Sequence, residues 1–362
     1  MNLRLVLFLL LSFLILAGCD DDDAGNPTLP KIKWKALGLD GKTVNQMQLH
    51  DNNLYIATNS GLYKYEVGAA AGSFVLIGFD AKNVQAIEVI DDEHLIASVY
   101  DKSGNEAPAL YITEDDGDNW DPVPQFGGNA PEPVFDFAIR PDNPDVWYAT
   151  GMGVIAKSED AGQTWEPIWG AWGSIGTGVA VVAVNPQGDK EIWAGGQGAI
   201  ENGFLLRSEN ENVWDLWDDL ADNPSTVKEI RFGEKGPDHI LVGFEGALLE
   251  TQDGGANWKT LIDSDEHKFF FGIGTSKADH NVLYVGGWLK TSDPQPLKLH
   301  ISDDGGETFK EEVFEGEPYG GIWEMVTIQN ATPGTDLLYL GLDKGGVYEV
   351  TIPLKLFQTQ AQ

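Results

Sequence analysis

Residues 158–165 read Ser-Glu-Asp-Ala-Gly-Gln-Thr-Trp, and near-copies of this stretch recur along the chain. Residues 113–120 read Thr-Glu-Asp-Asp-Gly-Asp-Asn-Trp, residues 251–258 read Thr-Gln-Asp-Gly-Gly-Ala-Asn-Trp, and residues 302–309 read Ser-Asp-Asp-Gly-Gly-Glu-Thr-Phe. A degraded copy at 208–214 keeps only its first Ser and its last Trp. The starts at 113, 158, 208, 251 and 302 are 45, 50, 43 and 51 residues apart, and a repeat of this length indicates a propeller or a solenoid.

Each position of the repeat has a local role in a tight hairpin. The Ser or Thr hydroxyl and the Asp carboxylate accept hydrogen bonds from turn N–H groups. Gly supplies a positive φ, and the aromatic residue begins the next strand with a large apolar face. The residues expected to do this are Thr113, Asp115, Gly117, Trp120, Ser158, Asp160, Gly162, Trp165, Thr251, Asp253, Gly255, Trp258, Ser302, Asp304, Gly306 and Phe309.

The pattern resembles the Asp-box, or BNR repeat, of sialidase-type β-propellers, and the chain is also similar to the seven-bladed photosystem-assembly type of protein. The resemblance implies an all-β fold. It implies little about activity, because such a motif folds a hairpin in enzymes and in non-enzymes alike. The photosystem-assembly type uses its propeller as a docking surface for another polypeptide. The basic patch expected of that group is lacking here, so its partner is not carried over.

Short alternating strands between the boxes divide the chain into seven repeats. Their innermost strands are predicted to start at residues 44, 84, 134, 179, 227, 270 and 322. The seventh repeat has no outer strand, but Ile32 to Leu37, with Trp34 as its aromatic residue, fits that place. We therefore predict a seven-bladed propeller of four-stranded blades over 31–354, closed by pairing of the two chain ends, and a C-terminal tail at 355–362. The alternative is an open or six-bladed ring with Trp34 in a loose arm.

The first eighteen residues are expected to be a secretory signal, because an apolar run follows Arg4 and is too short to span a membrane. The run ends Leu-Ala-Gly-Cys, which resembles the lipobox of bacterial lipoproteins and implies acylation of Cys19, the only cysteine in the chain. An ordinary signal with an incidental cysteine is the alternative. Residues 19–30 are expected to be an acidic flexible tether. The expected location is the bacterial outer membrane, at the cell surface or, alternatively, on the periplasmic side.

The chain carries 57 acidic and 23 basic side chains, a net charge of −34, which excludes a nucleic-acid partner. A solvated acidic surface is the simplest explanation, and multivalent cation binding is the alternative. No twelve-residue EF-hand loop and no His pair with metal-ligand spacing occur, so neither a metal nor any other cofactor is expected.

In propellers, ligands usually meet the face opposite the boxes. Three carboxylates share one register position near the channel mouth on that face and are weak catalytic candidates: Asp136, Glu229 and Glu324. Ligand-binding candidates around them are Gln46, Tyr100, Trp169, Trp172, Trp288, Tyr319 and Trp323, because aromatic faces beside carboxylates and amides suit sugar rings. The alternative for at least half of these tryptophans is packing between blades.

Sialidase chemistry is rejected, because the family resemblance implies three clamping arginines. Beyond Arg4 only Arg140, Arg207 and Arg231 remain, and the first two are expected on the box side. A glycoside hydrolase needs only two carboxylates, and some xyloglucanases resemble this repeat, although they use two facing propellers. We therefore predict a non-catalytic, lipid-anchored envelope propeller that binds a glycan or a partner protein. A polysaccharide-degrading hydrolase or lyase is the alternative.

Overall fold

The computed structural model describes residues 31–358, apart from 102, 104–105, 188–190, 201, 221–224, 265–267 and 330–331. The predicted signal at 1–18, Cys19 and the tether at 19–30 lie outside these residues. Among those described, no helix is long and apolar enough to cross a membrane. The single described helix, α1 (Lys355–Gln358), falls in the predicted tail.

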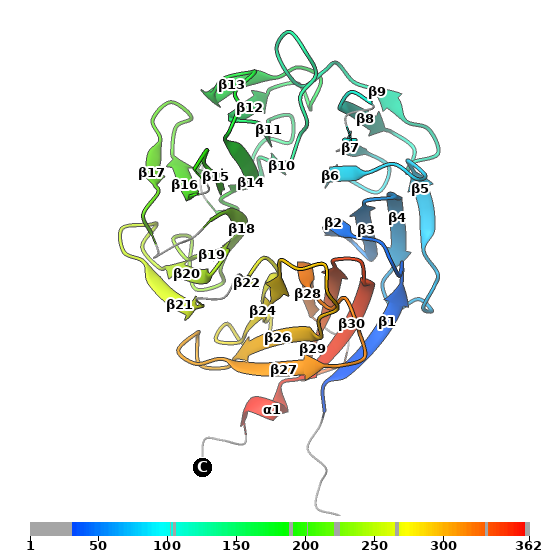
Figure 1. Cartoon of the computed structure of the whole chain (residues 1–362), viewed down its shortest axis with the longest axis vertical. Helices are drawn as coiled ribbons and strands as arrows, with labels where there is room; N and C mark the ends of the chain where they lie inside the picture. Colours follow the sequence, from blue (N-terminus) through cyan, green and yellow to red (C-terminus); the bar gives the residue numbers. More distant parts are fainter. Residues whose placement is uncertain are drawn as a thin grey trace, which may run out of the picture.

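Seven four-stranded antiparallel sheets surround a central channel, as predicted (Figure 1). The first three blades consist of β2 (Val44–His50), β3 (Asn53–Thr58), β4 (Gly61–Glu66) and β5 (Val75–Gly78); β6 (Val84–Val89), β7 (Leu95–Val99), β8 (Ala109–Thr113) and β9 (Asp121–Pro122); and β10 (Asp136–Ile139), β11 (Trp147–Gly151), β12 (Val154–Ser158) and β13 (Glu166–Gly170).

The next three blades consist of β14 (Gly178–Val184), β15 (Ile192–Gln197), β16 (Gly203–Ser208) and β17 (Asp215–Trp217); β18 (Val227–Phe232), β19 (Ile240–Phe244), β20 (Ala247–Thr251) and β21 (Lys259–Asp263); and β23 (Ile273–Thr275), β24 (Leu283–Gly286), β26 (Leu297–Ser302) and β27 (Lys310–Phe314). The sixth inner strand starts at Ile273 rather than at the predicted 270. The segment before it, β22 (Lys268–Phe269), instead pairs with β25 (Trp288–Leu289). The third inner strand starts at Asp136 rather than at 134.

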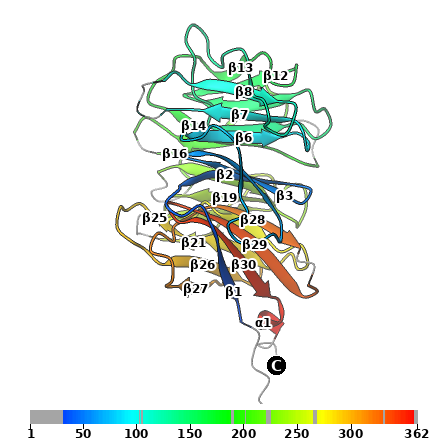
Figure 2. The same ribbon diagram turned by 90° about the vertical axis from the view of Figure 1, so that its right-hand side faces the viewer.

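The last blade joins the two ends of the chain, which confirms the predicted closure. It contains β28 (Ile322–Gln329), β29 (Thr335–Leu342), β30 (Gly346–Pro353) and the N-terminal β1 (Lys33–Gly38). Trp34 pairs with Val350, and its ring stacks on Phe314 with centroids 5.6 Å apart. Figures 1 and 2 show β1 lying along β30. Because β1 covers the edge of β30, the ring has no open blade.

The four repeats quoted above form the expected turns. In the second, Ser158 Oγ accepts from Gly162 N at 2.9 Å and donates to Asp160 Oδ1 at 2.7 Å. The same carboxylate accepts from Thr164 N at 2.8 Å. The glycine has a φ of 83°, in the left-handed region that glycine adopts at low cost.

All four boxes dock on one face of the ring. The fourth residue of each box donates its backbone N–H to the loop that joins the first two strands of its blade: Asp116 to Glu93, Ala161 to Asp145, Gly254 to Asp238 and Gly305 to Asn281. We call this side the box face and the opposite side, where the inner strands begin, the mouth face. The N-terminal end of β1 is on the box face, since Lys31 and Lys33 share a surface depression with Thr332 and Thr335 of the β28–β29 turn.

The hydrophobic core is divided into clusters between neighbouring blades. Aromatic side chains fill several of them; the indoles of Trp147 and Trp193, for example, are fully buried. Each blade therefore depends on both neighbours for burial of its apolar faces.

Replacing Trp34 should test ring closure. Trp34→Ala removes a half-buried indole from the β1–β30 contact, and we expect it to lower the free energy of unfolding by about 2–3 kcal/mol. Lys35→Ala is the matched control on the same strand, because its exposed ion pair with Glu349 should contribute less than about 1 kcal/mol. Urea unfolding of both variants is the measurement. Equal midpoints would contradict a closing role for β1.

Gly162 should tolerate no side chain. A Cβ on this residue would lie 2.7 Å from the Trp147 ring, in addition to the strain of its positive φ. Gly68 has a φ of 84° and no atom within 4 Å of such a Cβ. We expect Gly68→Ala to cost about 1–2 kcal/mol from backbone strain alone, and Gly162→Ala to cost clearly more. Thermal unfolding compares the two, and a similar loss in both would argue against this packing.

Candidate functional site

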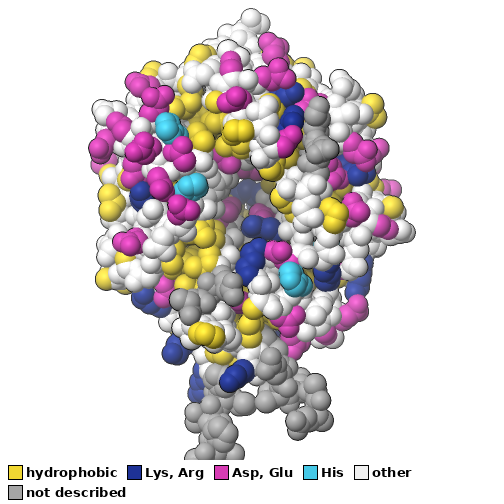
Figure 3. Space-filling view, turned by 180° about the vertical axis from the view of Figure 1, so that it is seen from behind, with side chains coloured by type: hydrophobic (Ala, Val, Ile, Leu, Met, Phe, Trp, Pro, Cys, Tyr) yellow, Lys and Arg dark blue, Asp and Glu magenta, His cyan; other side chains and the backbone are white. Residues whose placement is uncertain are grey.

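A cavity of about 350 Å³ opens at the mouth face of the channel. Figure 3, seen from behind the view of Figure 1, shows the opposite face of the ring, which is also hollowed at its centre, with basic and acidic side chains in the hollow. The cavity is lined mainly by polar side chains from the inner strands: Asn45, Gln46, Gln85, Tyr100, Phe135, Asp136, Gly178, Ala180, Val181, Gln197, Thr226, Lys228, Glu229 and Glu324. Its volume is at the small end of ligand pockets, so it suits a single side chain or sugar unit better than an extended polymer.

A β-bulge near the start of five inner strands shapes this cavity. The register with the second strand shifts between Val44 and Gln46, between Val84 and Ala86, and at the equivalent places in β14, β18 and β28. A bulge sets two successive residues opposite one and re-aims their side chains. Both Asn45 and Gln46, and both Lys228 and Glu229, therefore line the cavity.

Asp136 is held by protein groups on both carboxylate oxygens. Its Oδ1 accepts from Gln46 Nε2 at 2.9 Å and from its neighbour Phe137 N at 3.0 Å, and Oδ2 accepts from Val182 N at 2.9 Å. Burial raises the pKa of Asp136 to about 7, although the hydrogen bonds oppose this rise. The side chain thus ties β2 and β10 to β14.

Glu229 is paired with a cation deeper in the channel. Its Oε1 lies 3.0 Å from Arg231 Nη2, and the same guanidinium nitrogen is 3.5 Å from Met325 O. Burial raises the pKa of Glu229, and Arg231 works against that rise. The neighbouring Lys228 places its amine 3.7 Å from the centroid of the Trp323 ring, a short cation–π contact.

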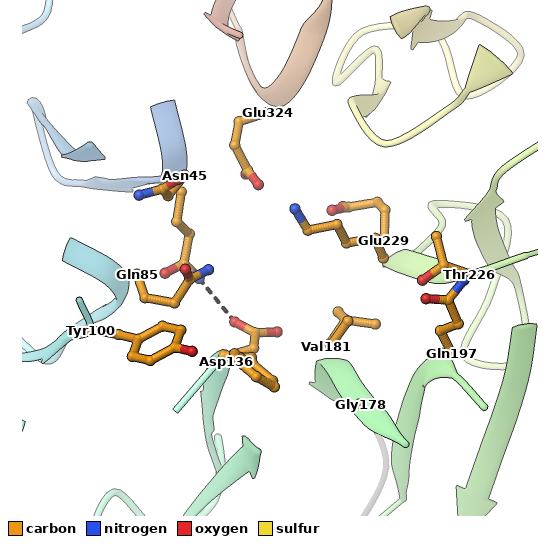
Figure 4. Close-up of a pocket in the computed structure, with 14 residues that line it drawn as sticks. Asn45, Gln85, Tyr100, Asp136, Gly178, Val181, Gln197, Thr226, Glu229 and Glu324 are labelled. Carbon is orange, nitrogen blue, oxygen red and sulfur yellow. Dashed lines mark hydrogen bonds between the residues drawn. The ribbon is translucent and has the colours of Figure 1, made fainter. Parts of the chain in front are cut away.

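Glu324 is the carboxylate with the fewest protein contacts. Within the described part of the chain it forms no hydrogen bond or ion pair. In Figure 4 it points into the same central space as Glu229 and Asp136. Burial, followed by the charge of Glu229, raises the pKa of Glu324 well above its ordinary value. Glu324 is therefore the carboxylate in the cavity most available to a ligand.

One further carboxylate lies on an inner strand outside the cavity lining. Glu88 accepts a hydrogen bond from Gln48 Nε2 at 2.8 Å, and burial raises its pKa to about 8. Gln48 Oε1 in turn accepts from Val89 N at 2.8 Å, and Gln46 Oε1 accepts from Ile87 N at 2.7 Å. These amides satisfy N–H groups on the free edge of β6.

The structure brings five of the candidate site residues together at the cavity: Gln46, Tyr100, Asp136, Glu229 and Glu324. The other five aromatic candidates are not part of the lining: Trp169, Trp172, Trp288, Tyr319 and Trp323. Their assignment to ligand binding stays a prediction.

Those five side chains pack against other residues. Trp169 lies in strand β13 and stacks on Phe204 with ring centroids 6.0 Å apart. Trp172 packs edge-on against Phe126 at 4.8 Å. Trp288, only 9% exposed, and Trp323 form a cluster with two phenylalanines, and Tyr319 faces the Lys344 amine at 5.6 Å.

Four of the lining residues that were missed share one place in the sequence pattern: Asn45, Gln85, Thr226 and Lys228. Each is adjacent to a valine that begins an inner strand, namely Val44, Val84 or Val227. That position was the available signal. This signal was hidden because successive side chains of a regular strand point to opposite sides. The residue after the valine and the one that follows it would therefore not both be expected to face the cavity.

The three arginines have separate carboxylate partners, consistent with the rejection of a sialidase clamp. Arg140 pairs with Asp142, and Arg207 pairs with Glu191 and lies beside Gly254 of a box. Only Arg231 reaches the channel. A possible cation-binding group, His50, Asp51 and Asp92, has ligand atoms within 4.8 Å of one another at the box-face ends of β2 and β6. Both carboxylates are exposed, and such groups are common on an acidic surface.

The comparisons with known proteins identify the fold. No family model and no curated protein matches the chain. Among solved structures, a GH74 xyloglucanase from Xanthomonas campestris is similar with a TM-score of 0.64 and 14% identity, over 88% of this chain and 53% of that one. The chain thus spans about half the length of that enzyme.

Two structures of YCF48 match over nearly their whole length. YCF48 from Cyanidioschyzon merolae has a TM-score of 0.62 and 12% identity, over 89% of this chain and 99% of that one. YCF48 bound to D1 peptide has a TM-score of 0.59 and 14% identity, over 89% and 96%. At these identities the likeness establishes the seven-bladed fold alone.

The buried carboxylate Glu88 should make stability depend on pH. Because its pKa in the folded state, about 8, is above the unfolded value of 4.5, only the unfolded state releases this proton as the pH first rises. The contribution of Glu88 to the free energy of unfolding should therefore be largest below about pH 4.5 and fall until the pH passes about 8.

Glu88→Gln should remove the part of the fall in the free energy of unfolding that is due to Glu88. This part is on the order of 1–3 kcal/mol between pH 5 and pH 8, after allowing for screening by water in the channel. Glu66→Gln, which changes an exposed carboxylate, is the control and should leave the pH profile unchanged. Urea unfolding across this range is the measurement. Parallel curves for Glu88→Gln and the unaltered protein would contradict the assignment.

Proposed function

We propose that the chain is a non-catalytic binding module that holds a partner polypeptide at the mouth of its channel. The observation that carries this proposal is that two of the three cavity carboxylates already have partners within the protein. Asp136 is occupied by three hydrogen bonds, and Glu229 is paired with Arg231. Two of the three candidate catalytic groups thus have structural partners, whereas a glycoside hydrolase needs two carboxylates acting on opposite sides of a bond.

The lining of the cavity favours a polypeptide over a glycan. Its aromatic members are Tyr100 and Phe135, and the tryptophans expected to stack on sugars are absent from it. Amide and carboxylate side chains predominate, and these groups suit the donors and acceptors of a peptide. The similar YCF48 bound to D1 peptide supports the idea that a propeller of this shape can hold a peptide.

The proposed location is the outer membrane, with a lipid anchor on Cys19 and the propeller at the cell surface. The support is the sequence of residues 1–30: an apolar run, a Leu-Ala-Gly-Cys stretch and an acidic tether. Metabolic labelling with an alkyne fatty acid tests it, since Cys19→Ser should abolish labelling.

A glycoside hydrolase is the second candidate, because one observation favours it. Glu324 has a raised pKa and no described partner, while the adjacent Glu229 is ion-paired. An acid with a raised pKa beside an ion-paired carboxylate resembles the arrangement that such chemistry uses. The small cavity and the match to only half of the GH74 enzyme weigh against it.

Two assays on the full chain in detergent distinguish these functions. We expect a panel of plant and bacterial polysaccharides to show no release of reducing ends or unsaturated products, and a displayed library of random heptapeptides to yield enriched sequences. Turnover that is lost in Glu229→Gln and in Glu324→Gln would replace the proposal with the hydrolase. Failure of the library to enrich any sequence would contradict the binding of a polypeptide.

A further inference from the structure

Two loops on the mouth face carry aliphatic side chains that are almost fully exposed. Ile175, between β13 and β14, is 89% exposed, and Ile200, between β15 and β16, is 85% exposed. The loops touch, since a Cβ placed on Gly176 would lie 3.2 Å from the Cβ of Ala199. The two isoleucines therefore lie on adjoining loops, and we call this pair the apolar area.

This apolar area borders the cavity. Gly178 and Gln197, which are part of the lining, are each three residues along the chain from Ile175 and Ile200. Isolated exposed aliphatic residues are common, but a pair on adjoining loops beside a cavity is typical of an interaction site. A partner that occupies the cavity and extends beyond this edge could therefore reach these side chains.

The charge of the cavity selects the kind of partner. Three carboxylates line it, Asp136, Glu229 and Glu324, against one lysine. That lysine, Lys228, holds its amine against the Trp323 ring, and Arg231 is engaged by Glu229. Glu324 forms no hydrogen bond or ion pair within the described residues, and burial and the charge of Glu229 raise its pKa by more than the charges of Lys228 and Arg231 lower it. An entering cation would reduce the cost of ionising Glu324 there.

We infer that the channel mouth receives a lysine or arginine side chain of a partner polypeptide, with Glu324 as its carboxylate partner, while apolar residues flanking that side chain pack on Ile175 and Ile200. This inference rests on the proposed function and specifies its ligand. The apolar area is the reason for a polypeptide, because a metal ion or a polyamine would leave the isoleucines in water. The net charge of −34 would also speed the approach of a basic partner.

The test uses fluorescein-labelled peptides of sequence Leu-Ala-Lys-Ala-Leu, together with versions carrying Gln or Glu at the centre. Binding to the full chain in detergent is followed by fluorescence anisotropy at 50 and 300 mM NaCl. We expect the Lys peptide to bind at least about tenfold more tightly than the Gln peptide, with a smaller difference at the higher salt concentration. The Glu peptide should bind weakest.

Two variants separate the charged contact from the apolar one. Glu324→Gln should remove the preference for Lys over Gln, while the double variant Ile175→Ser with Ile200→Ser should weaken both peptides about tenfold and keep the preference. The matched controls are Glu66→Gln, which changes an exposed carboxylate on β4, and Val313→Ser, which changes a 40% exposed aliphatic residue on β27; both should bind as the unaltered chain does. The thermal midpoint of each variant confirms that it is folded.

Any of the following outcomes would overturn the inference. Equal binding of the Lys and Gln peptides would exclude a cation pocket, and an unchanged preference in Glu324→Gln would exclude its proposed partner. Displacement of the Lys peptide by spermidine at equal affinity, with no effect of the isoleucine variants, would indicate a small-cation site. If the heptapeptide library enriches sequences without Lys or Arg, this inference fails while the proposed function stands, and if it enriches none, both fail.

Discussion

Each innermost strand of the ring has one edge that no other strand pairs with, and this constraint governs what the channel can contain. Backbone N–H groups on such an edge need partners, because an unpaired N–H inside a protein costs free energy. Here the partners are side chains from a preceding inner strand. Gln46 and Gln48 satisfy two N–H groups of β6, and Asp136 satisfies Val182. Polar residues in the channel are therefore required by the fold before any ligand is considered.

This requirement explains some of the cavity carboxylates but not all of them. Asp136 performs the same task as the two glutamines, so its position at a channel mouth does not imply chemistry. Glu229 is neutralised by Arg231, whereas Glu324 forms no hydrogen bond or ion pair in the part of the chain described. Only for Glu324 does the packing of the ring give no structural reason, and a functional role is argued most strongly where such a reason is lacking.

The sequence was sufficient for the architecture because its information is local and repeated. The box turn uses a hydroxyl, a carboxylate and a glycine within five residues, so four copies were enough to predict the hairpins. The alternating segments between them predicted seven blades and the β1–β30 closure. The site depends on relations between blades, and these were only partly readable. The shared register of Asp136, Glu229 and Glu324 correctly brought them to one cavity. The bulges that also direct Asn45 and Lys228 into it leave no mark in strand alternation. Aromatic residues were the weakest guide to the site, because the sequence does not distinguish a tryptophan that packs in the core from one that stacks on a sugar. Trp288, for example, packs against Phe269.

The starting point of β1 has a consequence for how the molecule would sit on a cell. Its first residues adjoin the β28–β29 turn, on the side of the ring that carries the boxes. If Cys19 carries the proposed lipid anchor, the twelve residues 19–30 can span no more than about 40 Å to that side. Under the proposed anchoring, so short a tether would favour an orientation in which the boxes face the bilayer and the acidic cavity faces the medium. The attachment side follows from the use of the N-terminal strand to complete the last blade.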